Sequence, residues 1–140
     1  MRYLIDTNIF IYLATDISSL SNDINAIIQD YDSALCISAE SLRELVIGYR
    51  NNSFSTKSWK TCTDLLKSIE NEFNIKVLPL KKEHMITYSK MTINEAEGHR
   101  DPSDHVIIAQ AITEKIPLIS SDRRFPFYKK QGLDLIFNKR

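Results

Sequence analysis

Cysteine, glycine and proline are scarce in this chain of 140 residues, which contains two cysteines, three glycines and four prolines. Cys36 and Cys62 show no metal-ligand spacing, and Cys36 lies in an apolar run, so the pattern favours a buried, reduced thiol over a metal site. The few glycines and prolines mark no linker or domain boundary. Since 43% of the residues are hydrophobic, we expect residues 1–140 to form a single globular domain with a full core.

Neither sign of charge is in excess, because 18 lysine and arginine residues balance 18 aspartate and glutamate residues. This balance argues against a generic nucleic-acid-binding surface, which is usually strongly basic, although local basic faces leave an RNA substrate open. No apolar run approaches the roughly 20 residues of a membrane span. Asp6 and Asn8 interrupt the first apolar run too early for a signal peptide. We therefore expect a cytoplasmic protein without membrane contact.

Three common catalytic signatures are missing as well. His84, His99 and His105 lack the i, i+4 pair of a zinc-binding helix. No glycine-rich phosphate loop is present, and no set of serine, histidine and aspartate has supporting context. Any catalytic chemistry must therefore come from other side chains.

Short apolar runs alternate with longer helical patterns, which predicts βαβ units and an α/β fold with a mainly parallel sheet. The strands are expected at residues 3–6, 35–37, 76–78 and 118–120, with an edge strand at 133–137. The helices are expected at residues 9–14, near 21–31, after an N-cap at Ser38, at 59–73, at 82–95, and from an N-cap at Asp101 to about Lys115. Residues 51–56 are polar and turn-rich.

Four acids occupy positions that a parallel sheet would bring together. Asp6 and Asp122 each close an apolar strand pattern, and Glu44 and Asp104 lie near the starts of two helical patterns. Strand C-termini and helix N-termini share one edge of such a sheet, and ligands bind there. Clustered carboxylates repel unless a cation holds them, and hard divalent ions prefer oxygen ligands. The pattern suggests metal-assisted cleavage of a phosphodiester.

Each of these acids also has a purely structural interpretation. Asp6 is suited to cap the following helix, and Asp122 is suited to cap the short segment after it. Glu44 lies off the apolar stripe of its helix, which indicates an exposed position or a capping box with Ser41. Glu40 fits an acid in the first helical turn, where the helix dipole favours it.

Asp104 is the most informative of the acids. It lies three and four residues before Ile107 and Ile108, so it extends the buried stripe of its helix toward the sheet edge. An unpaired carboxylate is costly to bury and needs a partner or a metal. Its alternative role is to support the helix dipole, whereas N-capping fully accounts for Asp101. We therefore choose Asp104 over Asp101 as the functional acid.

Several basic residues lie near the expected edge of the sheet. The candidates for contact with backbone phosphates are Arg43, Arg100, Arg123 and Arg124, for which a solvated surface position is the alternative. Four further basic residues are interpreted as a basic tail: Lys129, Lys130, Lys139 and Arg140.

Four short motifs resemble those of a known family. They are residues 4–8 (LIDTN), 44–48 (ELVIG), 101–111 (DPSDHVIIAQA) and 118–125 (LISSDRRF), which together span nearly the whole chain in the family's order. With them the sequence resembles PIN-domain proteins, in particular toxin ribonucleases of the VapC type. The resemblance implies a three-layer α/β/α fold, Mg²⁺ or Mn²⁺ as cofactor, endonucleolytic cleavage of RNA, a small antitoxin partner and commonly a homodimer.

The resemblance also assigns roles to individual residues. It places the catalytic and metal-binding acids at Asp6, Glu44, Asp104 and Asp122, with Asn8, Ser120 and Asp101 as supporting polar groups. Aspartates at both 101 and 104 leave the third acidic position ambiguous, and the buried stripe selects Asp104. One Mg²⁺, or two about 3.5–4 Å apart, would hold the phosphate and activate the attacking water.

Two other classes of function remain open. A phosphatase or phosphotransfer domain would use Asp6 as a covalent nucleophile, but Asp6-Thr7-Asn8 lacks the second acid that such a route usually needs. A catalytically silent binding module would use the acids only to cap helices. Metal-dependent cleavage of RNA, hydrolysis of a phosphomonoester, or neither, would separate the three.

Overall fold

Five parallel strands form one sheet in the computed structural model, which describes residues 1–54 and 56–140. Ser55, in the segment predicted to be turn-rich, lies outside the described residues. The strands are β1 (Arg2–Ile5), β2 (Ala34–Ser38), β3 (Lys76–Leu78), β4 (Leu118–Ser120) and β5 (Leu135–Phe137). Their order across the sheet is β3-β2-β1-β4-β5, and each neighbouring pair is parallel. The predicted parallel sheet and its edge strand are confirmed.

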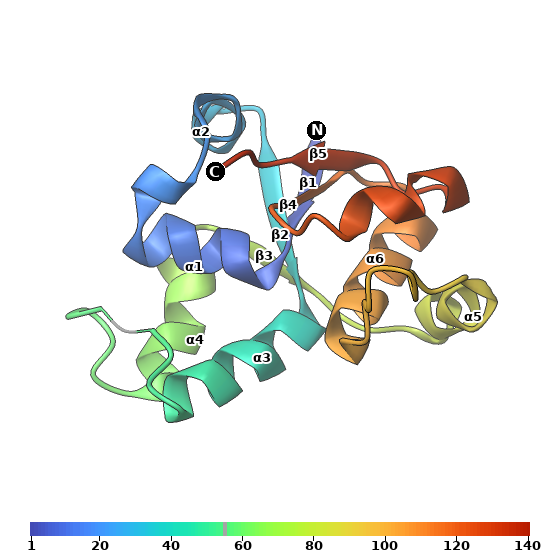
Figure 1. Ribbon diagram of the computed structural model, residues 1–140. Coiled ribbons are helices and arrows are strands. Elements are labelled where there is room, and N and C mark those ends of the chain that lie inside the picture. The colour runs from blue at the N-terminus through green and yellow to red at the C-terminus, as the bar shows by residue number, and fades with distance from the viewer. Residues whose placement is uncertain (55) are drawn as a thin grey trace.

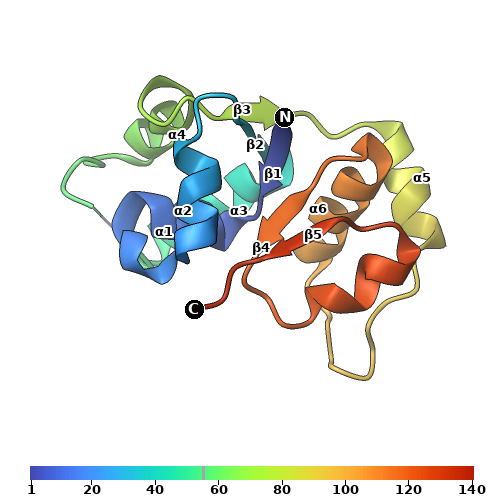
Figure 2. The same ribbon diagram turned by 90° about the horizontal axis from the view of Figure 1, so that it is seen from above.

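Helices cover both faces of the sheet, so the predicted three-layer α/β/α architecture is confirmed (Figures 1 and 2). One face carries α1 (Thr7–Thr15), α2 (Asn22–Gln29), α3 (Ala39–Arg50) and α4 (Cys62–Asn71), with a short 3-10 turn, η1 (Ile17–Ser19). The other face carries α5 (Lys82–Lys90), α6 (Pro102–Glu114) and the 3-10 helix η2 (Phe125–Gln131). No helix that the structure describes is long and apolar enough to cross a membrane.

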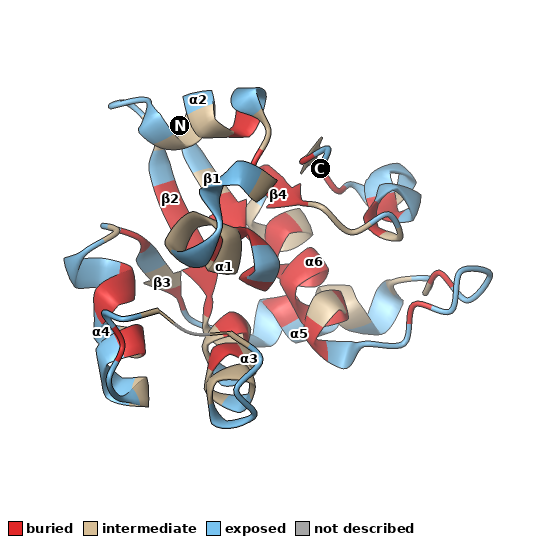
Figure 3. Ribbon diagram, turned by 60° about the vertical axis from the view of Figure 1, so that its left-hand side comes forward, coloured by how far each residue is buried: buried red, intermediate tan, exposed pale blue. Residues whose placement is uncertain are grey.

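Side chains that alternate between the two faces of the sheet divide the hydrophobic core into two clusters. Successive side chains of a strand point to opposite faces, so Ile5 packs into the cluster under α1 to α4 while Leu4 packs into the cluster under α6 and η2. Figure 3 shows the buried residues concentrated on the strands and on the sides of the helices that face them. The sheet is therefore buried on both faces, as parallel sheets usually are.

Two predicted helix starts are confirmed. The Ser38 hydroxyl accepts the N–H of Glu40 at 3.1 Å at the start of α3. The Asp101 carboxylate accepts the N–H of Ser103 at 2.9 Å at the start of α6, where Pro102 occupies the first helical position. These caps fix the helix ends that face the edge of the sheet described below.

Two predicted helix boundaries are wrong. Helix α4 begins at Cys62 rather than near residue 59, because Thr61 and Asp64 form a reciprocal capping box there. Helix α5 ends at Lys90 rather than near residue 95. The N–H of Asn94 instead donates to the Tyr128 hydroxyl, so residues 91–100 form a loop held against η2.

The order of the strands creates a topological switch point. The chain passes from the central strand β1 to β2 and β3 on one side, then returns to β4 on the other side of β1. Ligands of open α/β sheets bind in the crevice outside the carboxyl ends of the strands at such a point. We therefore expect a functional site at the carboxyl ends of β1 and β4.

Candidate active site

A cleft of about 260 Å³ opens at the carboxyl ends of β1 and β4. Its walls come from β1 and α1, from α3 and the segment after it, from the start of α6 and from the turn after β4. Its polar lining residues are Asp6, Thr7, Asn8, Glu44, Ser53, Asp101, Asp104, Asp122 and Arg124. The four acids that the sequence selected thus line one cavity, which we call the acidic cleft, together with Asp101 and the exposed Asn8.

Asp6 is held by two hydrogen bonds at the floor of the acidic cleft. Its Oδ1 accepts the N–H of Ile9 at 3.0 Å, and its Oδ2 accepts the hydroxyl of Ser120. Burial raises the pKa of Asp6 to about 6 from an ordinary 3.8, and the two hydrogen bonds oppose that shift. Asp6 therefore caps α1 and lines the cleft at once, and Ser120, predicted as a supporting group, contacts it directly.

Glu44 turns toward the cleft instead of outward, so the interpretation of an exposed side chain is wrong. Its Oε1 accepts the hydroxyl of Thr7, whose oxygen also lies 2.8 Å from the Ser41 hydroxyl. Ser38 caps α3, so the alternative capping box between Ser41 and Glu44 does not form. Burial raises the pKa of Glu44 above its ordinary value. The contact with Thr7 links α3 to the first turn of α1.

Asp104 is held by a histidine that the sequence reasoning did not select. The Nε2 of His99 lies 3.0 Å from Asp104 Oδ2, and the Nδ1 lies 2.8 Å from the Tyr128 hydroxyl. An ionised Asp104 can only accept a hydrogen bond, so in that state Nε2 of His99 carries the ring hydrogen and the Tyr128 hydroxyl donates to Nδ1. Burial lowers the pKa of His99, which keeps the imidazole neutral as it donates to Asp104.

The charge around Asp104 is concentrated and uncompensated. Its pKa is raised from 3.8 to about 8, first by burial and then by the carboxylates of Asp101, Asp6, Glu44 and Asp122. A nearby positive charge would favour the ionised form and reverse this shift. Asp104 is therefore the carboxylate in this cleft that gains most from a cation.

Asp122 is the one acid of this set with an arginine partner. Arg124 donates from Nε to Oδ1 at 3.0 Å and from Nη2 to Oδ2 at 2.8 Å. Burial acts to raise the pKa of Asp122, but the hydrogen bonds and charge of Arg124 outweigh it and hold the pKa below its ordinary value. The N–H of Arg124 also donates to Asp122 in a turn, but Arg124 and not Asp122 is the N-cap residue of η2, so the predicted capping role of Asp122 is wrong.

The donor groups fit a divalent cation that prefers oxygen. Ligand atoms of Glu44, Asp101 and Asp104 lie within 4.8 Å of one another, as do those of His99, Asp104 and Asp122. Both ring nitrogens of His99 are hydrogen-bonded, so the two carboxylates are the oxygen donors of the second group. Asp104 belongs to both groups. A set dominated by carboxylate oxygens suits Mg²⁺ or Mn²⁺ better than a soft ion. Asp101 lies closer to this centre than its capping role alone predicts.

The four arginines predicted near the edge differ in their surroundings. Arg43 donates to Glu40 and, at 2.8 Å, to the Ser103 hydroxyl, and Arg124 is paired with Asp122. Arg100 and Arg123 are exposed and line two other pockets. Contact with phosphate remains a prediction for all four.

One family model and several solved structures of known proteins match this chain. Residues 3–131 match the family model described as PIN domain. VapBC2 of Rickettsia felis bound to a promoter DNA fragment aligns with a TM-score of 0.73 at 18% identity, over 99% of this chain and 100% of the other. VapBC-1 of nontypeable Haemophilus influenzae aligns with a TM-score of 0.68 at 20% identity, over 98% of both chains.

DNA-bound VapBC of Salmonella typhimurium aligns with a TM-score of 0.66 at 18% identity, again over 98% of both chains. At these identities the solved structures establish a shared fold. No match was found among curated protein sequences. The family match covers most of the chain, and the acidic residues of the chain meet at the carboxyl edge of the sheet. The chain belongs to the PIN domain family.

Proposed function

We propose that this protein is a metal-dependent endoribonuclease, the toxin of a VapC-type toxin–antitoxin pair. The observation that carries the proposal is the acidic cleft, where Asp6, Glu44, Asp101, Asp104 and Asp122 meet at the topological switch point. PIN domains are generally nucleases, and similar solved structures are those of VapBC pairs, which supports the same role here. Hydrolysis of a phosphodiester by metal-activated water also explains a site whose described lining is dominated by carboxylates.

The proposed mechanism uses water as the nucleophile. A divalent cation in such a site polarises a phosphate oxygen and lowers the pKa of the attacking water. Asp104, Glu44 and Asp122 would hold the cation with Asp6, and one carboxylate would accept the proton from water. Ser120, Thr7 and His99 would keep Asp6, Glu44 and Asp104 in place, because each donates a hydrogen bond to its acid.

Two observations favour this mechanism over an Asp6 nucleophile. Both carboxylate oxygens of Asp6 accept hydrogen bonds, from Ile9 and Ser120, which hold the side chain in its capping position and make it a weaker nucleophile than a free carboxylate. The described residues that line the cleft include no lysine to hold a phosphomonoester. The binding-module alternative predicts no catalysis at all and is separated by experiment.

The cleft also suits a basic inhibitor. A guanidinium pairs bidentately with carboxylates, so an arginine of a small partner could occupy the place of the cation. Ile47, whose side chain is 46% exposed, lies beside Glu44 in an adjoining pocket with Pro102 and offers apolar contact area for that partner. Homodimer formation remains a prediction from the resemblance, and a cytoplasmic location remains a prediction from the sequence.

Cleavage of RNA by the purified protein tests the proposal. We expect fragments from single-stranded RNA with Mg²⁺ or Mn²⁺, none with EDTA, and none with Asp104→Asn at saturating metal. Asp134→Asn is the matched control, because Asp134 is an exposed acid outside the cleft and should keep full activity. Hydrolysis of p-nitrophenyl phosphate without RNA cleavage would support the phosphatase instead, and neither activity would support the binding module.

Expression in cells tests the partner. Growth should stop when the protein is expressed alone and recover when the neighbouring reading frame is co-expressed. Sequencing of RNA ends after brief expression would identify the cleavage site. Unimpeded growth together with no stable complex would contradict both the toxin role and the partner.

A further inference from the structure

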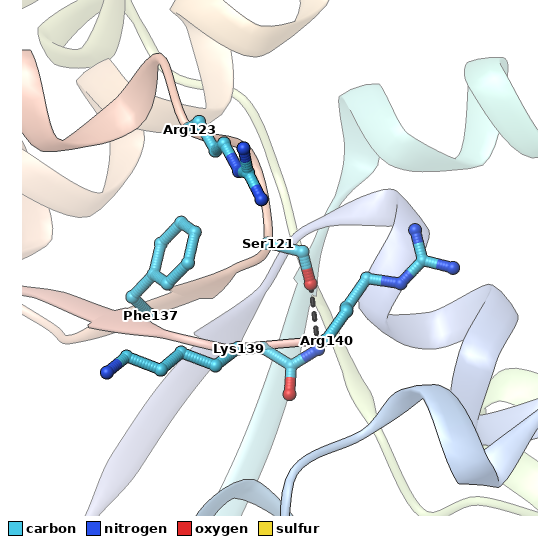
Figure 4. Close-up of a pocket in the computed structure, with 6 residues that line it drawn as sticks. Ser121, Arg123, Phe137, Lys139 and Arg140 are labelled. Atoms are coloured by element: carbon cyan, nitrogen blue, oxygen red, sulfur yellow. Dashed lines mark hydrogen bonds between the residues drawn. The ribbon is translucent and has the colours of Figure 1, made fainter.

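A second pocket, of about 470 Å³, lies on the other side of the turn that follows β4 (Figure 4). It is lined by Ser121, Arg123, Phe137, Asn138, Lys139 and Arg140, and we call it the basic pocket. Three of its lining residues are cationic and none is acidic. Its charge is therefore opposite to that of the acidic cleft, although the chain as a whole has no net charge.

The two cavities share one wall. Ser121 and Arg123 line the basic pocket, whereas Asp122 and Arg124 line the acidic cleft, so successive residues of this turn face alternate cavities. The pairing of β4 with β5 adds a second link. Phe137 lies in register with Ser120, whose hydroxyl holds Asp6. A polymer that crosses residues 121–124 would therefore contact both cavities.

The basic pocket is firmly attached to the sheet. The buried side chain of Asn138 donates to the Ser121 hydroxyl at 2.8 Å and to the Ser19 carbonyl at 2.9 Å, and accepts the N–H of Ser21 at 2.7 Å. Its backbone N–H donates to the Ser120 carbonyl at 2.8 Å. Figure 4 shows the bond to Ser121 at the centre of the pocket. These bonds fix Asn138, and with it the end of β5, relative to the acidic cleft.

Phe137 presents an aromatic face that the core does not use. Its strand neighbours Leu135 and Ile136 pack against the two hydrophobic clusters of the described chain, but Phe137 belongs to neither. In Figure 4 its ring projects into the pocket from β5, with Arg123 extending from the opposite side. The Arg140 guanidinium lies 4.6 Å from the centre of the Tyr12 ring, which anchors the far end of the pocket.

This combination of groups fits one class of ligand. Single-stranded nucleic acids are bound without sequence preference by cations that follow the backbone and by aromatic rings on which bases stack. Without a bound cation the carboxylates of the acidic cleft repel phosphates, so a neighbouring cationic surface would add attraction for an RNA backbone. An isolated phenylalanine on an edge strand would not by itself indicate a ligand, but Arg123, Lys139 and Arg140 line the same pocket, which adjoins the acidic cleft.

We propose that the basic pocket binds a nucleotide of single-stranded RNA next to the scissile phosphate. The base stacks on Phe137, and Arg123, Lys139 and Arg140 contact the neighbouring phosphates. The proposal rests on the proposed function, since it assigns the substrate of the same site. It also replaces the interpretation of Lys139 and Arg140 as part of a basic tail, and it gives Arg123 a defined place in binding.

The binding of a labelled single-stranded RNA 10-mer, measured in EDTA by fluorescence anisotropy, tests the proposal without catalysis. The binding constant Kobs falls as salt is added, and the slope of log Kobs against log[salt] measures the phosphate contacts. The triple variant Arg123→Gln/Lys139→Gln/Arg140→Gln should reduce the magnitude of this slope by about 2, because each phosphate contact on a single strand contributes about 0.7. The matched control is Lys67→Gln/Lys129→Gln/Lys130→Gln, which removes the same charge from exposed positions outside the pocket. Its slope should stay near that of the wild type.

The aromatic contact has its own test. Phe137→Leu keeps apolar bulk but loses the stacking face, and we expect RNA affinity to fall at least about 5-fold. Phe137→Tyr keeps the face and should retain most of the affinity. The circular dichroism melting curve of each variant reports whether β5 is intact.

The outcomes separate this proposal from the proposed function. Unchanged RNA affinity and salt slope in the pocket variants, while the wild type cleaves RNA with Mg²⁺, would overturn the pocket and leave the function standing. Pocket-dependent RNA binding without any cleavage would do the reverse. An equal loss in the control triple variant, or normal RNA binding with loss of a protein partner, would also overturn the proposal.

Discussion

The acidic cleft and the basic pocket show how one turn separates two opposite kinds of surface. In the cleft, neutral donors hold Asp6, Glu44 and Asp104, and only Asp122 has an arginine partner. In the basic pocket, Arg123 and Lys139 are exposed to solvent, where an isolated charge costs little. The carboxylates of the cleft are therefore stabilised by a bound cation or by protonation, whereas the exposed charges of the pocket remain available to a phosphate.

Loss of a carboxylate from the cleft should have the largest effect. We expect Asp104→Asn, and likewise Asp6→Asn, to reduce RNA cleavage by more than the roughly 10–100-fold typical of outer-shell changes, with the fold intact. Without metal, Asp104→Asn should also raise the melting temperature, because it relieves repulsion among the remaining carboxylates. Initial cleavage rates at saturating Mg²⁺ and thermal melts in EDTA check both. Full activity of either variant would remove that acid from the site.

Loss of the His99 hydrogen bond to Asp104 should have the second-largest effect on activity. His99→Leu should weaken Mg²⁺ activation by about 10–100-fold, because the hydrogen bond at Nε2 no longer orients the carboxylate. His99→Gln is the matched variant, since its amide nitrogen can still donate from a similar position. Titration of activity with Mg²⁺ distinguishes a positioning role, in which the half-saturating concentration rises, from a general loss of folded protein. Equal behaviour of the two variants would contradict the role of the hydrogen bond.

The pH dependence of stability should be smaller but has a definite sign. The pKa of Asp104 is about 8 and that of Asp6 is about 6 in the folded protein, both above the ordinary 3.8. The folded state thus binds these protons more tightly, so their contribution to stability is complete below about pH 4 and is lost as the pH rises toward 8. In EDTA the melting temperature should fall between pH 5 and 8, and Asp104→Asn should flatten the fall.

Substitution of Asp101 should have the smallest effect. Asn is also a good N-cap, so Asp101→Asn should retain the cap of α6 and lose only the carboxylate charge beside Asp104. Asp101→Ala should cost about 0.5–2 kcal/mol of unfolding free energy through the lost cap. Urea unfolding and cleavage rates measure the two effects separately. If Asp101→Asn abolished both cleavage and metal affinity, Asp104 would be the wrong choice between the two.

Local patterns in the sequence predict the strand ends and helix starts that carry the acids of the site. The apolar runs that end at Asp6 and Asp122, the caps at Ser38 and Asp101, and the buried stripe before Ile107 follow from neighbouring residues alone. Parallel strands then bring their carboxyl ends to one edge, so the gathering of these acids in one cleft was predictable as well.

Contacts between distant residues were not predictable in this way. The spacing of the histidines does not single out His99, and its bond to Tyr128 joins residues 29 positions apart. The orientation of Glu44 depends on Thr7, which lies on another helix. The end of α5 at Lys90 depends on the later segment that binds Asn94. A histidine five residues before a candidate acid was the only local signal for the positioning group.

The affinity of the cleft for a divalent cation tests the central claim most directly. Thermal unfolding at pH 8 would be followed as Mg²⁺ or Mn²⁺ is added to metal-free wild type and to Asp104→Asn. A cation that binds only the folded protein raises stability by mass action, so the melting temperature of the wild type should rise with each increment and that of the variant should barely change. A flat response in the wild type, or equal increases in both proteins, would contradict a cation site centred on Asp104.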